Sequence, residues 1–326
     1  MADLERMETL AFGPVPSRRL GRSLGVNNIP AKTCSYSCVY CQLGKTTHLT
    51  VERQAFFEPE DILKEVKRKL GRANQRNEQA DYLTLVPDGE PTLDLNLGKT
   101  IRLLRQTDIP VAVLTNASLV WRGDVKRDLI GADLVCLKVD AVSRDLWTTI
   151  NRPHKDLKLD VVLEGMTQFA RQFKGTIISE TMLMEGLSYG DELEKIADFL
   201  KKLEMLDKAY ISIPTRPPTE KWVKPANKET VNTALKIFSK RLGVKRVECV
   251  TGYEGDSFAF LGKVEEDLLS ITAVHPMRKE AVVEFLRKAN ADWHVIEKLL
   301  EEDRLTELEY KGKKYYLGRG GNRVET

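Results

Sequence analysis

From residue 80 onwards, the chain alternates short apolar runs with longer amphipathic segments. The apolar runs have the length of strands, and apolar residues in the segments between them follow helical spacing. The strand-like runs are residues 82–86, 111–114, 134–139, 176–184 and 210–213, and the helical segments are 94–106, 124–129, 143–173, 191–203 and 228–240. Such regular alternation predicts parallel strands that are joined by crossover helices.

The region before residue 80 adds one more strand and one more helix to this pattern. Residues 24–29, before the cysteines, are the expected first strand, and residues 60–70 have helical spacing. After the last helical segment, residues 246–250 are a candidate seventh strand. The runs lack polar alternation, which agrees with parallel strands that are buried on both faces. Six or so units are too few for an eight-unit barrel. We therefore predict an α/β fold, a partial (β/α)6 TIM-like barrel, with ligands at the carboxyl ends of the strands.

The last part of the chain has a different pattern. Two segments of helix length, 279–288 and 292–302, precede two short strand-like segments, 304–309 and 314–317. Two helices followed by a hairpin is the order of a winged helix. We predict a barrel domain over residues 1–262 and a small C-terminal winged-helix domain over residues 263–326.

Composition indicates a globular protein. Of 326 residues, 42% are hydrophobic, which is enough for a large core, and no stretch approaches the roughly 18 apolar residues of a membrane span. The N-terminal segment lacks the basic-then-apolar order of a signal peptide. We expect a soluble cytoplasmic protein with no membrane partner. The net charge of +3 comes from 51 basic and 48 acidic residues, so at most a local patch would bind nucleic acid.

Three of the five cysteines, Cys34, Cys38 and Cys41, fall within eight residues. Thiolates are the ligands of iron–sulfur clusters and of zinc. A structural zinc site needs a fourth ligand, and His48 is the nearest histidine but is poorly spaced for it. Three ligands on a four-iron cluster leave one iron open, which is a catalytic arrangement. The spacing therefore favours a [4Fe–4S] cluster over zinc.

This C-x3-C-x2-C motif, with the aromatic Tyr40 before the last cysteine, resembles the signature of the radical S-adenosylmethionine (SAM) superfamily. The resemblance implies a [4Fe–4S] cluster on Cys34, Cys38 and Cys41 whose open iron binds the amino and carboxylate groups of SAM. It also implies an electron donor such as ferredoxin or flavodoxin. In that family, one electron cleaves SAM to methionine and a 5′-deoxyadenosyl radical, which abstracts hydrogen from the substrate.

Residues 88–93, Asp-Gly-Glu-Pro-Thr-Leu, directly follow the strand-like run 82–86. They match the "GE" motif of the same family, which implies that Gly89 and Glu90 hold the SAM amino group. An ammonium requires a carboxylate or carbonyl acceptor, and a glycine lets the backbone approach closely. The alternative for this segment is an ordinary Asp-Gly turn.

Polar residues stand at the ends of three further apolar runs. Buried charges are costly unless they are paired or used, so these residues suggest an interior that binds ribose hydroxyls and a carboxylate. The resemblance places cofactor contacts at such strand ends, and we assign them to Asn116, Lys138, Asp140 and Glu180. The alternatives are a structural pair of Lys138 with Glu180 or Asp140, and a turn cap at Asn116.

Other candidate roles are less specific. The resemblance implies that the backbone of Ile213, in the sixth run, meets the adenine. Lys138 is a candidate for Schiff-base catalysis, by analogy with wyosine synthesis, and Arg216 is a candidate for facing the substrate or for a loop role. Cys136 and Cys249 are expected to be inert apolar residues.

Residues 13–252 resemble Fe–S oxidoreductases related to archaeal 4-demethylwyosine synthase, which acts on tRNA. The chain departs from that enzyme because no cysteine of a second cluster precedes Cys34. Residues 263–326 contain 12 basic and 13 acidic residues. One stretch there is wholly basic and contains tyrosines, a pattern that suits RNA phosphates and bases; it comprises Lys311, Lys313, Lys314, Arg319 and Arg323 with Tyr310, Tyr315 and Tyr316.

The substrate is therefore open among tRNA, a protein or peptide, and a small molecule. Arg18, Arg19 and Arg22 suit an anionic substrate, or they merely close the barrel. An alternative of another class is a non-catalytic Fe–S or zinc binding regulatory module. Glu90 favours the enzyme, because a metal-binding regulator has no use for it.

Overall fold

A curled eight-stranded sheet forms the centre of the protein in residues 10–318, which are the residues that this computed structural model describes. The strand order is β1-β2-β5-β6-β7-β8-β9-β10. Strand β1 (Ala11–Ser17) is antiparallel to β2 (Gly21–Val26), and every later neighbour in the sheet is parallel. The other strands are β5 (Tyr82–Leu85), β6 (Val111–Thr115), β7 (Leu134–Lys138), β8 (Thr176–Met182), β9 (Leu206–Ser212) and β10 (Val247–Val250).

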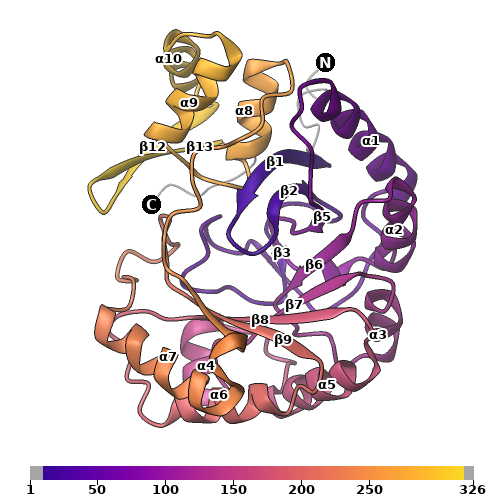
Figure 1. The fold of residues 1–326 in the computed structure, drawn as a ribbon, viewed down its shortest axis with the longest axis vertical. Helices are drawn as coiled ribbons and strands as arrows, with labels where there is room; N and C mark the ends of the chain where they lie inside the picture. The colour runs from indigo at the N-terminus through magenta and orange to yellow at the C-terminus, as the bar shows by residue number, and fades with distance from the viewer. Residues whose placement is uncertain (1–9, 319–326) are drawn as a thin grey trace.

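Helices cover the convex face of this half-barrel, as Figure 1 shows. They are α1 (Pro59–Gln75), α2 (Leu97–Leu104), α3 (Gly123–Leu129), α4 (Arg144–Asn151), α5 (Leu159–Gln172), α6 (Glu192–Lys201) and α7 (Lys228–Leu242). Helix α1 illustrates why the sequence folds in this way. Pro59 is compatible with the first helical turn, and Ile62, Val66 and Leu70 form the stripe that the sheet buries.

The predicted α/β partial barrel is confirmed, and each predicted strand is present within a few residues of its expected bounds. The candidate seventh strand is β10. Two details differ from the prediction. The segment 143–173 forms two helices, because Arg152 adopts a left-handed conformation (φ 44°) directly before Pro153. Strand β1 was not predicted because Pro14 and Pro16 interrupt it, and prolines in sheets are typical of edge strands.

Alternate residues of the strands face the two sides of the sheet. Val135 and Leu137 of β7 belong to the large core beneath the helices. Cys136, between them, belongs to a separate apolar cluster with residues of β6, β8, β9 and β10, which fills part of the concave side. By the same alternation, Lys138 and Glu180 at the ends of β7 and β8 face the concave side.

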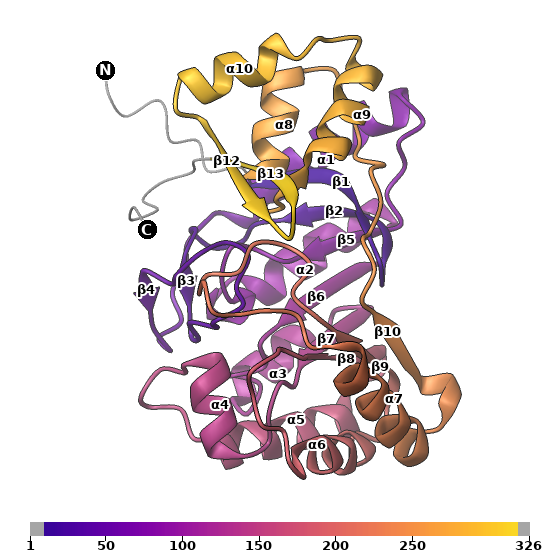
Figure 2. The same ribbon diagram turned by 90° about the vertical axis from the view of Figure 1, so that its left-hand side faces the viewer.

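The C-terminal segment, or tail, packs beside β1 and α1 (Figure 2). It contains α8 (Val264–Thr272), β11 (Met277–Arg278), α9 (Lys279–Ala289), α10 (His294–Glu301), β12 (Leu305–Tyr310) and β13 (Lys313–Gly318), with the strands in the order β11-β13-β12. Phe12 and Val15 of β1 share an apolar cluster with Leu268 of α8. The two predicted helices and the hairpin are α9, α10 and β12–β13; the winged-helix assignment and the boundary at 262/263 stay predictions.

Two of the predicted basic residues of the tail, Arg319 and Arg323, lie outside the described residues. Within the described part of the chain, no helix is both long and apolar enough to cross a membrane.

Candidate active site

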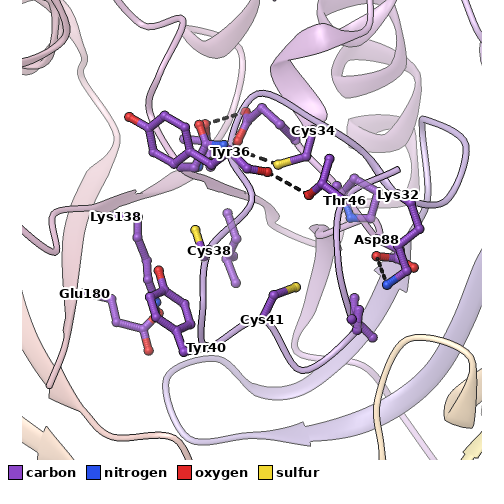
Figure 3. A pocket seen from close by; sticks show the side chains of 18 of the residues that line it. Lys32, Cys34, Tyr36, Cys38, Tyr40, Cys41, Thr46, Asp88, Lys138 and Glu180 are labelled. Atoms are coloured by element: carbon purple, nitrogen blue, oxygen red, sulfur yellow. Dashed lines mark hydrogen bonds and ion pairs between the residues drawn. The ribbon is translucent and has the colours of Figure 1, made fainter. Parts of the chain in front are cut away.

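The cysteine loop lies at the carboxyl edge of the sheet, between β2 and α1. Two short strands, β3 (Thr33–Cys34) and β4 (His48–Leu49), pair in parallel and hold the base of the loop together. Cys34, Cys38 and Cys41 all line one cavity of ≈ 200 Å³. The loop therefore brings the three predicted ligands to a common space, and Figure 3 shows their sulfur atoms there.

The ends of four neighbouring strands supply another part of the cavity wall, as predicted for ligand sites in such sheets. Strand β5 is followed by the wall residues 87–90, the end of β6 and the residue after it contribute 114–116, β7 contributes Cys136 and Lys138, and β8 contributes Glu180. The cavity wall also contains an ion pair that was not predicted. Lys32 Nζ lies 3.1 Å from Asp88 Oδ1, on the opposite side of the cysteines from Lys138 and Glu180 in Figure 3.

Gly89 allows the segment after β5 to lie against the cysteine loop. The Glu90 backbone N–H donates to the Thr33 carbonyl at 3.1 Å. A Cβ atom added at Gly89 would overlap that carbonyl oxygen and would stand 2.8 Å from Ile29 Cδ1. Gly89 thus lets the backbone approach closely, as expected, and the segment that it approaches is the cysteine loop. This contact positions Glu90 at the cavity.

Glu90 is a buried carboxylate that no cation of the described residues pairs with. Its Oε1 accepts from Thr92 N–H (3.0 Å), Thr92 Oγ1 (2.6 Å) and Thr115 Oγ1 (2.6 Å), and its Oε2 accepts from Asn116 N–H (2.7 Å). Burial raises the pKa of Glu90, although these hydrogen bonds oppose the rise. A cation that enters the cavity would supply the missing charge. Thr92 and Thr115 were missed as partners; the only sequence signal was a hydroxyl at the end of an apolar strand.

Two asparagine amides donate to cysteine sulfurs. Asn116 Nδ2 lies 3.5 Å from Cys34 Sγ, and Asn151 Nδ2 lies 3.5 Å from Cys38 Sγ. Asn116 was predicted as a cofactor contact, and the structure places it both in the cavity wall and against a predicted ligand. Asn151 was not predicted, because it is on α4, 113 residues from Cys38, and nothing in its local sequence marks it.

Glu180 is held between two cations. Arg19 Nη1 lies 2.5 Å from Oε1, and Lys138 Nζ lies 3.2 Å from Oε2. Burial opposes ionisation of Glu180, but Arg19 and Lys138 outweigh it and lower the pKa of the carboxyl. Burial likewise opposes the charge of Lys138, yet Glu180 and Asp140 raise the pKa of its amine. In this arrangement Lys138 is a paired ammonium, so the structural pair is present, whereas its Schiff-base role stays a prediction.

Asp140 points to Tyr40 and Asn151, and it is not among the residues that line the cavity. Its Oδ2 accepts from Tyr40 OH and, at 2.8 Å, from Asn151 Nδ2, while Oδ1 accepts from the Met182 backbone N–H at 2.9 Å. Tyr40 itself lines the cavity. Asp140 thus orients two groups beside Cys38, and a direct contact with the cofactor stays a prediction.

Ile213 and Arg216 also lie outside the cavity wall. Ile213 packs against the large core. Arg216 links three parts of the chain: Nε donates to Glu254 Oε1 at 3.1 Å, Nη1 donates to Gln42 beside the cysteine loop, and Nη2 lies 2.6 Å from Nε2 of His275 in the tail. This geometry assigns Arg216 a linking role, and its catalytic role stays a prediction.

The chemistry of the cavity fits an iron–sulfur cluster. Burial, and next the charge of Asp140, raise the pKa of Cys38 to about 12, so a bound cation would be needed to hold this sulfur as a thiolate. Within residues 10–318 no group of three or more His, Cys, Asp or Glu side chains is arranged around a single metal ion. In a four-iron cluster each cysteine binds a different iron, so three sulfurs spread around one cavity suit it.

Comparison with known proteins decides the family. The family description "Radical SAM superfamily" matches residues 28–200, which is more than half of the chain. The chain belongs to the radical SAM superfamily. Radical SAM proteins use a [4Fe–4S] cluster and SAM, so this chain is an enzyme with those cofactors, and the predicted superfamily is confirmed.

This radical SAM chain is also similar to a curated protein and to solved structures. A UPF0026 protein of Methanocaldococcus jannaschii is 50% identical over 95% of this chain and 96% of its own length. A radical SAM methyltransferase of Sphaerobacter thermophilus shares the fold, with TM-score 0.52 and 15% identity over 71% of this chain and 67% of that chain. TYW1 with a lysine-pyruvate adduct has TM-score 0.49 and 18% identity over 67% of this chain and 73% of that chain. The relation to 4-demethylwyosine synthase rests on the sequence resemblance.

Proposed function

We propose that this enzyme holds its [4Fe–4S] cluster on Cys34, Cys38 and Cys41, cleaves SAM reductively, and uses the product to modify a substrate that is not yet identified. The observation that carries the proposal is the shared cavity. Three thiols from one loop and the buried Glu90 carboxylate face the same space at the carboxyl edge of the sheet. A low-potential donor such as ferredoxin or flavodoxin would supply the electron.

The residues around the cavity have separate roles in binding. When bound, the cluster supplies the electron that cleaves SAM. Glu90 is the acceptor for the SAM amino group, and Thr92 and Thr115 fix its orientation before the ligand arrives. Lys138 and Glu180 stand where a carboxylate and ribose hydroxyls of SAM can be bound. Tyr40, whose hydroxyl donates to Asp140, lines the cavity beside Lys138, whose Nζ lies 4.9 Å from the centre of the tyrosine ring.

The tail leaves the substrate alternatives open. Lys313 Nζ pairs with Glu280 at 3.0 Å, and Lys314 Nζ pairs with Glu307 at 2.7 Å. Neighbouring carboxylates therefore balance the positive charge of these two lysines, which does not favour RNA over the other classes. A tRNA, a protein or peptide, and a small molecule stay the alternatives.

The direct test is anaerobic reconstitution with iron and sulfide, followed by dithionite and SAM. We expect 5′-deoxyadenosine to form, as measured by chromatography, and SAM to bind the cluster-loaded protein in equilibrium dialysis. The two readouts are needed together, because an enzyme can bind SAM and await its substrate before cleavage. A fully loaded protein that neither binds nor cleaves SAM would contradict the proposal.

Asn116 offers a test of the sulfur contacts. Asn116→Ala removes the amide that donates to Cys34 Sγ, so the reduced cluster loses the stabilisation of its added negative charge. One hydrogen bond contributes about 0.5–1.5 kcal/mol, so we expect the midpoint potential to fall by roughly 20–60 mV. A redox titration followed by electron paramagnetic resonance measures it. An unchanged or higher potential would remove this role.

A further inference from the structure

The tail contacts the cysteine loop at Gln42, the residue after Cys41. Gln42 Nε2 donates to the backbone carbonyl of Val274 in the tail at 3.3 Å. Its Oε1 accepts from Nη1 of Arg216, which lies in the loop that follows β9. Leu43, the next residue, is buried in the apolar cluster that contains residues of α8 and β1. This stretch of the cysteine loop therefore meets the tail through polar and apolar contacts together.

Arg216 is itself bound to the tail. Its Nε donates to Glu254 Oε1 at 3.1 Å, and its Nη2 lies 2.6 Å from Nε2 of His275, which directly follows Val274. A guanidinium only donates, so His275 accepts through this nitrogen and its ring is neutral. Burial, and next the charge of Arg216, lower the pKa of His275 to about 3, in agreement with a neutral ring. Arg216 thus contacts the cysteine loop and the tail at the same time.

A buried carboxylate holds Arg216 in this position. The Glu254 side chain is 1% exposed. Burial opposes its ionisation, but Arg216 outweighs burial and lowers the pKa of the carboxyl to about 2. Arg18 brings a second positive charge to the same carboxylate. Loss of one partner of a buried pair is costly because the other charge stays buried, so Glu254 restricts where the guanidinium can lie.

The loop after β9 also holds the backbone of Cys41. Thr219 Oγ1 donates to the Cys41 carbonyl at 2.7 Å. The tail reaches this loop a second time, because the Tyr315 hydroxyl donates to the Thr215 carbonyl at 2.8 Å. The tail and the loop after β9 therefore form one support behind Cys41, whose thiol lines the cavity.

The other two cysteines are supported from elsewhere. Cys34 is part of β3, which pairs with β4 within the cysteine loop. Val39, the neighbour of Cys38, donates its backbone N–H to the Ile150 carbonyl of α4 at 2.9 Å. Cys41 differs from them because the residues that follow it contact the tail.

We propose that Gln42 and Arg216 are positioning residues that hold Cys41 against the tail, so that cluster binding and tail docking stabilise each other. The inference rests on the proposed function, because it takes Cys41 as a cluster ligand. Groups that orient a metal ligand contribute to the affinity for the metal. By reciprocity, a tail that favours the ligand position of Cys41 is itself held more tightly once the cluster is bound.

Hydrogen exchange of the full chain tests this reciprocity. Exchange of the backbone amides of residues 264–278 is followed by mass spectrometry under anaerobic conditions, before and after cluster reconstitution. One hydrogen bond corresponds to a factor of about three to ten in an equilibrium, so we expect cluster loading to slow this exchange about three- to tenfold. Gln42→Met keeps the length of the side chain and removes both hydrogen bonds, so it should reduce the slowing. Wild-type exchange that is unaffected by cluster loading would overturn the inference.

Iron release and the spectrum of the cluster are the second test. We expect Gln42→Met to release iron to a chelator about three- to tenfold faster than wild type. Its reduced cluster should give a broader electron paramagnetic resonance spectrum, because Cys41 no longer has one fixed orientation. Lys69→Met is the matched control, since Lys69 Nζ lies 3.4 Å from Ser270 Oγ and joins the tail to α1 instead of the cysteine loop. It should keep the wild-type rate and spectrum. A wild-type rate and spectrum in Gln42→Met, or equal changes in Lys69→Met, would contradict the positioning role.

SAM binding and cleavage, measured on the same samples, separate this inference from the proposed function. SAM cleavage by a wild-type protein whose tail exchange does not respond to the cluster contradicts only this inference. Slower tail exchange on cluster loading, without SAM binding or cleavage, contradicts only the proposed function. A chain that takes up no cluster contradicts both.

Discussion

Cys38→Ala is expected to abolish cluster binding and all formation of 5′-deoxyadenosine. Cys38 is the middle residue of the motif, and its sulfur lies in the cavity beside Asn151. Its removal leaves two thiols for four irons. Loss of a residue that merely supports a ligand costs about 10- to 100-fold in metal affinity, so loss of the ligand itself should cost more. Iron and sulfide content after reconstitution measures the effect.

Cys136→Ala is the matched control for this experiment. Cys136 lines the same cavity but is part of β7 and of the concave apolar cluster. Burial raises the pKa of its thiol to about 11, so it is expected to remain protonated and inert. The variant should keep its full cluster content. A Cys38→Ala protein with normal iron and sulfide, or a Cys136→Ala protein without them, would refute the ligand assignment.

Glu90→Ala should weaken SAM binding and also destabilise the fold. The change strands the backbone N–H groups of Thr92 and Asn116 in a buried site, together with two threonine hydroxyls that can rotate. Each stranded buried donor costs about 1–3 kcal/mol, so we expect the free energy of unfolding to fall by about 2–5 kcal/mol. Chemical denaturation measures this loss. The SAM ammonium loses its carboxylate, which should raise the dissociation constant about 100-fold or more.

Two further variants separate the binding effect from the stability effect. Glu90→Gln keeps the shape and removes the charge, so it should weaken SAM binding even where the alanine variant fails to fold. Glu192→Gln alters another buried carboxylate, which accepts from the Val142 and Ser143 N–H groups away from the cavity. It should lower stability and leave SAM affinity unchanged. Equal SAM affinity in wild type and Glu90→Gln would remove Glu90 from the binding site.

The barrel and the cysteine motif were predictable because both depend on short-range patterns. The strand-like runs 111–114 and 134–139 became β6 and β7 almost as predicted, since a mainly apolar run of that length is buried on both faces of such a sheet. The motif is a local spacing on one loop. Strand β1 was missed because its prolines hide the pattern, and only its pairing with β2 reveals it.

Lys138 and Asp140 show where sequence reasoning ends. They are two residues apart, and both were predicted to meet the cofactor, but only Lys138 lines the cavity. Lys138 is still within β7, where strand alternation sets its direction. Asp140 follows the strand, and its direction is decided by Tyr40, which is 100 residues away in the sequence.

The sequence by itself therefore determined the class of fold, the three thiols and the position of Glu90 after a strand. Each is a property of a few adjacent residues, which local sterics and burial translate directly into structure. Only the tertiary structure decided which charges meet. Arg19 reaches Glu180 across 161 positions of sequence because the sheet curls. The pairing of charges inside a barrel depends on residues of strands that are far apart in the sequence, so a local sequence pattern does not predict it.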